Sequence, residues 1–226
     1  MPDLTFETTT GALDISIDHL IVAGWTGRDA AKVQHHIDEL AEIGVQPPSQ
    51  VPLYYRVGAG LLTQAPQISV VGPDTSGEAE PFVVSDATGR LWLGLASDHT
   101  DRALETASVA KSKQVCPKPV APMLWPFDQL APHLDELTLT SEIKENGSDS
   151  WTLYQSGALT AIRPLPALMR GLPEEKLSAG SAMLCGTIPA TGGIRPAHTF
   201  RMSLADPVLG RTITHSYHVT ELPVIA

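Results

Sequence analysis

The chain is poor in cysteine and in positive charge, and it has no long hydrophobic run. Cys116 and Cys185 are the only cysteines among 226 residues, so we expect reduced thiols and no disulfide framework. The formal net charge is −10 without a basic cluster, which argues against nucleic acid or an anionic membrane as a partner. No apolar run approaches the roughly 18 residues of a membrane-spanning helix, and residues 1–5 lack the regions of a signal peptide. We therefore expect a cytoplasmic protein.

The sequence also lacks three widespread catalytic or binding motifs. No Gly-x-Gly-x-x-Gly follows a predicted strand, no Gly-Lys-Ser/Thr of a phosphate-binding loop occurs, and Gly-x-Ser-x-Gly is absent. His215 and His218 lie three positions apart in a predicted strand, where their side chains face opposite ways, so they make a poor zinc site. Cys116 has no base nearby in the sequence and is interpreted as a packed thiol.

What the chain does have is many turn-forming residues and an ordinary apolar content. With 18 glycines, 19 prolines and 42% hydrophobic residues, the sequence favours short elements around one sizeable core. Period-two alternation predicts about nine or ten short strands. Three helices are expected, at residues 26–43, at residues 100–111 as a helix or a helical turn, and at residues 165–170. We predict a β-rich α+β fold in a single domain spanning residues 1–226, with an N-terminal strand region at residues 1–20.

One amphipathic helix is predicted between residues 26 and 43. Thr26-x-x-Asp29 resembles a capping box, and the apolar residues of the segment lie on one helical face. His36 and Glu39, three residues apart, fall on one side of this helix. Their neighbour His35 is expected to point elsewhere, into solvent. An extra loop, residues 44–50, follows the helix.

The most informative stretch is Glu78-Ala79-Glu80, with Asp98 eighteen residues after Glu80. In a strand the two glutamates project to the same side, and a hairpin formed by residues 81–84 and 91–96 would return Asp98 to them. Three converging carboxylates repel one another unless a cation lies among them, and an all-oxygen set suits Mg²⁺, Mn²⁺ or Ca²⁺. The alternative is a chance acidic pair on a solvated edge of the sheet.

A series of motifs, in this order along the chain, resembles the fumarylacetoacetate hydrolase superfamily, in an uncharacterised bacterial branch. The motifs are residues 51–57, the Glu78/Glu80 pair, Asp98-His99-Thr100-Asp101-Arg102, Ala110-Lys111-Ser112, residues 177–181 and residues 184–187. The resemblance implies a mostly antiparallel β-roll, a homodimer, and a Mg²⁺ or Mn²⁺ site (Ca²⁺ being possible) formed by Glu78, Glu80 and Asp98. It also implies a lid formed by residues 26–50.

The resemblance further implies roles for residues around the metal. His36 and Glu39 match the His-x-x-Glu dyad that activates a water, in which the carboxylate orients the imidazole that takes the proton. Their alternative is a pair of solvated side chains. Lys111 matches the family lysine that pairs with a substrate oxyanion or carboxylate, whereas its neighbour Lys113 is expected to be exposed.

Two further residues match the family motifs at the substrate. Arg102 is expected to bind an anionic group of the substrate, or else to form a surface ion pair. Thr187 is expected to hold substrate oxygens, or else to be part of an ordinary turn. His99, beside Asp98, is expected either behind the metal site or on the surface. The gap between Glu80 and Asp98 is shorter than in most relatives, which puts the substrate in doubt more than the fold.

We therefore expect a metal-dependent hydrolase that cleaves a C–C bond in a small anionic 2-oxo or 1,3-dicarbonyl acid of the acylpyruvate kind. The ion would chelate the 2-oxo-carboxylate end as a Lewis acid. The sequence leaves open a decarboxylase, a hydratase or an isomerase on the same site. It also leaves open a ligand-binding dimer without catalysis, or a structural domain.

Overall fold

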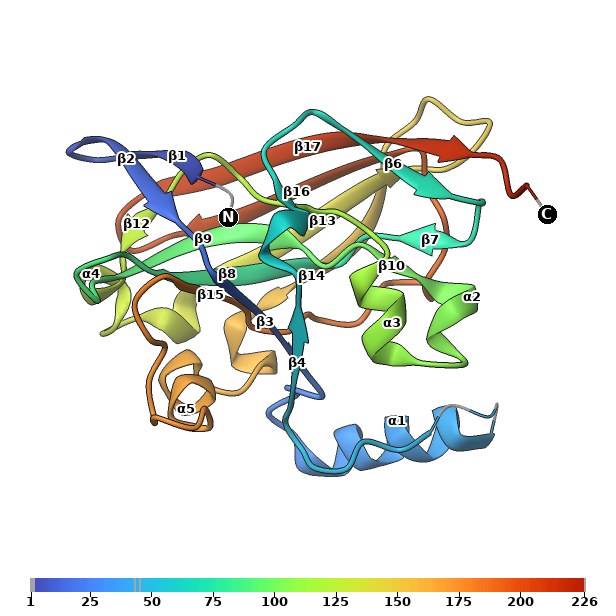
Figure 1. Cartoon of the computed structure of the whole chain (residues 1–226), viewed down its shortest axis with the longest axis horizontal. Coiled ribbons are helices and arrows are strands. Elements are labelled where there is room, and N and C mark those ends of the chain that lie inside the picture. Colours follow the sequence, from blue (N-terminus) through green and yellow to red (C-terminus); the bar gives the residue numbers. More distant parts are fainter. Residues whose placement is uncertain (1–2, 43, 45, 226) are drawn as a thin grey trace.

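The chain folds into two main sheets and a few short helices (Figure 1). The computed structural model describes residues 3–42, 44 and 46–225. The six-stranded sheet has the order β12 (Trp125–Pro126), β9 (Leu91–Ser97), β8 (Ala79–Ser85), β15 (Ser181–Leu184), β3 (His19–Gly24) and β4 (Leu53–Val57). The five-stranded sheet has the order β14 (Thr152–Ala158), β13 (Thr138–Lys144), β16 (Thr199–Asp206), β17 (Arg211–Leu222) and β6 (Gln67–Val71). The predicted β-rich α+β fold is confirmed.

Most neighbouring strands run antiparallel, and two parallel pairs make both sheets mixed. β15 runs parallel to β3, and β17 runs parallel to β6. Three two-stranded sheets accompany them: β1 (Asp3–Thr8) with β2 (Gly11–Ser16), β7 (Thr75–Ser76) with β10 (Thr100–Asp101), and β5 (Leu62–Thr63) with β11 (Lys118–Pro119). The small β7–β10 pair adjoins the ends of β8 and β9, where the acidic residues lie.

Strand β8 lies at the centre of the molecule, and all seven of its residues are buried. On one side, Val83 packs in a core that also contains Leu139 and Phe200 of the five-stranded sheet. On the other side, Phe82 packs in a second core with Phe6 of the β1–β2 hairpin. A strand that is covered on both faces is a run of apolar residues rather than an alternation. Glu78, which directly precedes this strand, and Glu80, its second residue, are therefore held at the end of the most buried strand.

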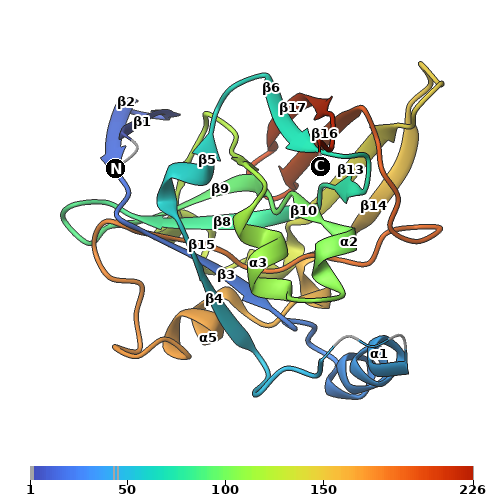
Figure 2. The same ribbon diagram turned by 45° about the vertical axis from the view of Figure 1, so that its right-hand side comes forward.

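The helices are short, and they differ in how much of their surface is covered. They are α1 (Ala30–Glu42), α2 (Arg102–Glu105), α3 (Val109–Gln114), α4 (Phe127–Leu130) and α5 (Leu165–Arg170). Figure 2 shows α2 and α3 beside β10, and α1 set apart from both sheets. Within the described part of the chain, no helix is both long enough and apolar enough to cross a membrane.

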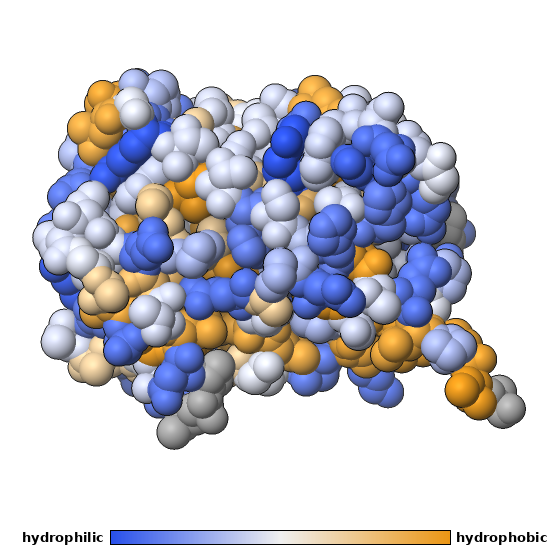
Figure 3. Space-filling view, turned by 90° about the horizontal axis from the view of Figure 1, so that it is seen from above, coloured by the Kyte–Doolittle hydropathy of each residue, from blue (hydrophilic) through white to orange (hydrophobic). Residues whose placement is uncertain are grey.

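Much of the surface seen from above in Figure 3 is hydrophilic. Apolar residues project where the C-terminal segment leaves β17, and Leu222, Val224 and Ile225 are exposed there. Leu222 is the last residue of β17, and Val224 and Ile225 follow it; all three lie far along the chain from the acidic stretch.

Most of the predicted elements are confirmed, and one predicted helix differs from the structure. The helix at residues 165–170 is confirmed, and α1 fills most of the predicted segment, although Ile43 lies outside the described residues. The helix or helical turn predicted from residue 100 to 111 is confirmed only in part, because β10 and two separate helices, α2 and α3, occupy that segment. The Asp101 side chain accepts a hydrogen bond from the Leu104 N–H and begins α2, and Ser108 does the same for α3.

The number of strands was underestimated. Among the described residues, β5, β7, β10, β11 and β12 contain only two residues each. An element of two residues has no period that a sequence pattern can reveal.

Candidate metal centre

The β8–β9 hairpin brings Asp98 back to the two glutamates, as the sequence predicted. The register pairs Ala79 with Ser97, and the Asp98 N–H donates to the Glu78 carbonyl at 2.9 Å. The turn between the strands is fixed by Asp86, whose carboxylate accepts hydrogen bonds from Thr88 and from the Trp92 side chain. The hairpin therefore fixes the relative position of Glu78 and Asp98 through the backbone alone.

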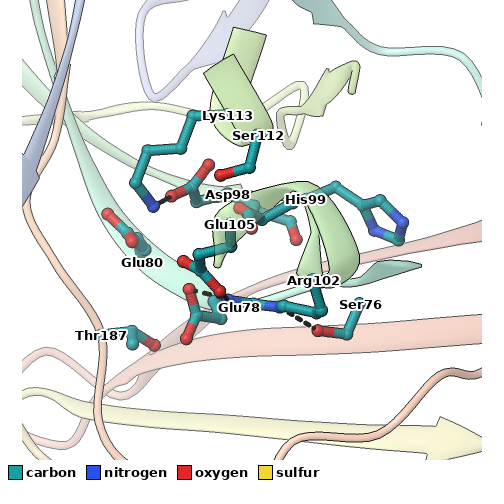
Figure 4. Close-up of polar contacts among 12 residues, drawn as sticks. Ser76, Glu78, Glu80, Asp98, His99, Arg102, Glu105, Ser112, Lys113 and Thr187 are labelled. Atoms are coloured by element: carbon teal, nitrogen blue, oxygen red, sulfur yellow. Dashed lines mark hydrogen bonds and ion pairs between the residues drawn. The ribbon is translucent and has the colours of Figure 1, made fainter. Parts of the chain in front are cut away.

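The three carboxylates converge on one point. Glu78, Glu80 and Asp98 each offer an oxygen atom, and these atoms all lie within 4.8 Å of one another (Figure 4). Asp98 is fully buried, Glu80 is 2% exposed and Glu78 is half-buried. The prediction that these three residues form one acidic cluster is confirmed.

Two buried lysines balance the negative charge of Asp98. Lys113 Nζ lies 2.5 Å from Asp98 Oδ2, and Lys118 Nζ lies 3.1 Å from Asp98 Oδ1. Burial would raise the pKa of Asp98, but the charges of the two lysines outweigh it and hold that pKa well below its usual value. Lys118 Nζ also donates to the His99 carbonyl at 2.5 Å. Asp98 is therefore ionised and fixed from two directions.

Glu80 has no cation paired with it. Its Oε2 accepts the Gly186 N–H at 2.7 Å, and the described residues offer it no ion pair. Burial, followed by the nearby charge of Asp98, raises the pKa of Glu80 well above its ordinary value. A positive charge placed among the three carboxylates would reverse this shift, since it favours the ionised form.

Glu78 is held by Arg102, which is itself largely buried. Arg102 Nη2 lies 3.2 Å from Glu78, Nη1 donates to Glu105 at 2.9 Å, and Nε donates to Ser76 Oγ at 2.7 Å. Burial would lower the pKa of Arg102, but the two carboxylates raise it. The prediction that Arg102 binds substrate stays a prediction, because the structure shows its guanidinium bound to protein groups.

Thr187 supports the acidic strand from the side. Its hydroxyl donates to the Ala79 carbonyl at 2.7 Å and accepts from Gln155 Nε2 at 2.6 Å. Gln155 Oε1 in turn accepts the Ala79 N–H at 3.0 Å. Thr187 and Gln155 therefore fix the backbone between the two glutamates, and a contact of Thr187 with substrate stays a prediction.

The two lysines of α3 are placed opposite to expectation. Lys113, which was expected to be exposed, is 6% exposed and contacts Asp98, so that expectation is wrong. Lys111 is exposed and forms no ion pair with a described residue, and its role toward substrate stays a prediction. The reason is the start of α3, since Ser108 caps the helix and thereby turns Ser112 and Lys113 toward the core.

The His36/Glu39 pair lies on α1, away from the sheets (Figures 1 and 2). His36 Nδ1 is 3.6 Å from Glu39 Oε2, and the two side chains are 60% and 58% exposed. The expectation that His35 points elsewhere is wrong, because its Nε2 lies 3.3 Å from Glu39 Oε1, although its side chain is exposed as expected. Activation of a water by His36 and Glu39 stays a prediction.

His99 lies behind the acidic cluster and not on the surface. It is 1% exposed, its Nδ1 lies 3.0 Å from the Tyr217 hydroxyl, and its Nε2 lies 2.9 Å from Thr75 Oγ1. Burial, and then the charges of Lys118 and Arg102, lower the pKa of His99 to about 3. The imidazole is therefore neutral and acts as a hydrogen-bonding support.

Sequence reasoning missed Lys118 altogether. The signal for it is a single lysine between Pro117 and Pro119 in an otherwise apolar run, where a lysine needs a buried partner. Gln155 carried no such signal, because its partners lie far away in the sequence.

The residues present fit a hard divalent cation. The donors are all carboxylate oxygens, and they converge within 4.8 Å of one another; Asp98 Oδ1 accepts no hydrogen bond of good geometry from the described residues and has Lys118 Nζ as an ion-pair partner at 3.1 Å. Four carboxylates, those of Glu78, Glu80, Asp98 and Glu105, face three cationic side chains, those of Lys113, Lys118 and Arg102. With Glu80 ionised, as a bound cation would favour, one negative charge is left over, which a divalent ion would more than offset.

The chain belongs to the family described as "Protein of unknown function (DUF2848)", whose sequence model matches residues 23–217. A comparison with curated proteins finds no match. The family description carries no activity, so function must be argued from the site and from the fold.

Solved structures show which fold this is. A proposed fumarylpyruvate hydrolase from Burkholderia cenocepacia is 17% identical, with 99% of this chain and 97% of that chain covered and a TM-score of 0.62. A 2-keto-3-deoxyarabinonate dehydratase is 16% identical over 95% of this chain and 78% of its own, with a TM-score of 0.65. A fumarylacetoacetate hydrolase from Exiguobacterium antarcticum is 15% identical over 95% and 80%, with a TM-score of 0.60. The chain has the fumarylacetoacetate hydrolase fold, as the motifs indicated.

Proposed function

We propose that this member of the DUF2848 family is a divalent-metal-dependent enzyme that acts on a small anionic 2-oxo acid. The preferred reaction is hydrolytic cleavage of a C–C bond in an acylpyruvate-like substrate. The observation that carries the proposal is the convergence of Glu78, Glu80 and Asp98 within 4.8 Å at the end of the most buried strand. Solved structures with this fold include proteins described as hydrolases and as a dehydratase of oxo acids, and this supports the reaction class.

Glu78, Glu80 and Asp98 would hold Mg²⁺ or Mn²⁺. When bound, the ion would supply Lewis-acid chemistry toward the 2-oxo-carboxylate end of the substrate. Arg102 and Gly186 keep Glu78 and Glu80 in place, and Lys118 does so for Asp98. Lys113 is the other cation that holds Asp98 in place.

A second reaction is favoured by one observation. His36 and Glu39 are exposed and lie on a helix set apart from the sheets, so no described contact links them to the carboxylates. A decarboxylase, hydratase or isomerase of a 2-oxo acid would need the metal site without this dyad. We also propose that the protein forms a homodimer, as the resemblance to the fumarylacetoacetate hydrolase superfamily implies. Analytical ultracentrifugation would test this by measuring the mass of the protein in solution.

The experiment is a turnover screen of acylpyruvates, oxaloacetate and 2-keto-3-deoxy sugar acids with Mn²⁺, with Mg²⁺ and with a chelator. We expect metal-dependent turnover that Glu80→Gln abolishes, together with loss of Mn²⁺ binding measured by calorimetry. Glu7→Gln, which changes an exposed glutamate of β1, is the matched control. Mn²⁺ binding of Glu80→Gln equal to that of the wild type would overturn the assignment of the site.

A further inference from the structure

Trp25 has an unusual backbone conformation beside the candidate metal centre. It follows β3 directly and adopts φ +60°, in the left-handed region that side chains other than glycine rarely occupy. Such conformations persist only where the surrounding structure holds them, and they concentrate at functional sites. The contacts around Trp25 must therefore stabilise this conformation.

Two contacts hold the turn that contains Trp25. The Trp25 indole N–H donates to the Tyr55 hydroxyl of β4 at 3.1 Å. Thr26 packs on Gly186 so closely that a Cβ atom at Gly186 would lie 1.7 Å from Thr26 Oγ1. Gly186 is the residue whose N–H binds Glu80. The turn is therefore separated from the acidic cluster by one residue.

Tyr55 connects the same turn to the other side of the cluster. Lys113 Nζ, which binds Asp98, lies 5.8 Å from the centre of the Tyr55 ring. Trp25 and Tyr55 are each only half-buried, so both rings keep exposed surface. The aromatic pair, Trp25 and Tyr55, therefore borders the acidic cluster on the side of Lys113.

The charges around the aromatic pair limit what can lie on it. Lys113 is engaged with Asp98, and Arg102 is engaged with Glu78 and Glu105. A second carboxylate on a substrate would thus find both cations occupied by protein carboxylates. Aromatic rings, in contrast, favour planar groups through stacking and edge-to-face contacts.

We propose that the aromatic pair determines substrate specificity by contacting the end of the 2-oxo acid that is remote from the metal, and that this end is an aromatic or other planar unsaturated group without charge. The inference rests on the proposed function, since it places the 2-oxo-carboxylate end at Glu78, Glu80 and Asp98. It narrows the substrate class to monocarboxylic 2-oxo acids with a planar tail. The His36 ring, whose centre lies 6.0 Å from that of Trp25, then approaches the tail rather than the metal.

The test measures binding, so that it does not depend on which reaction is catalysed. Mn²⁺-loaded protein is titrated calorimetrically with pyruvate, phenylpyruvate and oxaloacetate, which share the 2-oxo acid and differ in the tail. We expect phenylpyruvate to bind about tenfold more tightly than pyruvate, as an aromatic contact of about 1.4 kcal/mol predicts. Oxaloacetate should bind no more tightly than pyruvate.

Variants assign the preference to the aromatic pair. Trp25→Ala and Tyr55→Leu should remove the advantage of phenylpyruvate and leave pyruvate binding within about twofold, a difference of about 0.4 kcal/mol. Trp151→Ala is the matched control, because Trp151 stacks on Arg201 and Lys144 and belongs to neither the acidic cluster nor the aromatic pair. Should Trp25→Ala fail to fold, Tyr55→Phe removes only the hydroxyl that accepts the indole N–H and should reduce the preference partly.

The outcomes separate the two proposals. If pyruvate binds but phenylpyruvate has no advantage, or if Trp25→Ala and Tyr55→Leu keep that advantage, the inference fails and the proposed function stands. If oxaloacetate binds more tightly than phenylpyruvate, the inference also fails. If none of the three acids binds to the Mn²⁺-loaded protein, the proposed function fails and the inference fails with it.

Discussion

The acidic end of the β8–β9 hairpin and helix α1 carry the two groups of residues on which a hydrolytic mechanism would depend. At the hairpin, each carboxylate is held by at least one named partner: Gly186 for Glu80, Arg102 for Glu78, and two lysines for Asp98. On α1, the only ion-pair partners of His36 and Glu39 among the described residues are each other and His35, and the His36 ring also lies near Trp25; the His36 and Glu39 side chains are more than half exposed.

The difference follows from the free energy of burial. An ionised group inside a protein must be paired, whereas the same group in water needs no partner. The buried cluster is therefore determined by its neighbours, and its geometry should not survive the loss of one of them. The exposed dyad is free to change position, and the fold does not depend on it. The predictions below test this contrast between the two regions.

Removal of the Asp98 carboxylate should have the largest effect. Asp98→Ala leaves Lys113 and Lys118 buried without their common partner, and breaking a buried ion pair in this way costs about 3–5 kcal/mol. Denaturant unfolding monitored by circular dichroism measures the change. The control on α1 is Asp38→Ala, which removes an exposed carboxylate bound to Gln34 and should change stability by less than about 0.5 kcal/mol. Equal losses of unfolding free energy in Asp98→Ala and Asp38→Ala would contradict the difference between the buried cluster and α1.

The two lysines of α3 give a closer comparison within one helix. Lys113→Met removes a charged hydrogen bond to Asp98 while Lys118 remains, so we expect a loss of about 2 kcal/mol. Lys111→Met changes an exposed side chain and should be within about 0.5 kcal/mol of the wild type. Denaturant unfolding measures the loss of stability in both variants. A larger loss of unfolding free energy in Lys111→Met than in Lys113→Met would contradict the placement of α3.

The acidic cluster could be predicted because its geometry depends on local rules. The period of two along a strand puts Glu78 and Glu80 on one side, and a short hairpin returns Asp98 to them. The short helix at residues 165–170 was also predicted, and its local signal is Pro166, which stands near its start. Both inferences use only residues that are close together in the sequence.

The partners of the cluster could not be predicted, because each depends on contacts between distant segments. The choice between Lys111 and Lys113 depends on the residue at which α3 begins, and an error of two positions exchanges a buried lysine for an exposed one. The hydrogen bonds from Gly186 to Glu80 and from Gln155 to Ala79 join residues 106 and 76 positions apart. No periodic pattern carries that information.

The buried region should also respond to pH through His99. Its pKa is lowered from 6.5 to about 3, so between these values the unfolded chain binds more protons and the folded protein loses stability as the pH falls. The slope for one such group is at most about 1.4 kcal/mol per pH unit. Glu80 has a raised pKa and contributes with the opposite sign above its usual pKa, since its folded form prefers the proton.

The difference between wild type and His99→Gln therefore isolates the histidine. Unfolding free energies measured from pH 4 to pH 7 should show a steeper loss toward acid in the wild type than in the variant. Parallel curves would mean that His99 is not the neutral, buried group that the structure shows.

The smallest effect on stability is expected for substitutions on α1. Because these variants stay folded, their turnover can decide whether His36 and Glu39 take part in catalysis. His36→Ala and His35→Ala each remove an exposed partner of Glu39, and each should change the unfolding free energy by less than about 0.5 kcal/mol. Turnover then separates the two, because a hydrolase that uses the dyad should lose about 100-fold or more in kcat with His36→Ala while its Mn²⁺ affinity is unchanged. Equal kcat values for both variants and the wild type would favour a reaction that the buried carboxylates and Lys113 support alone.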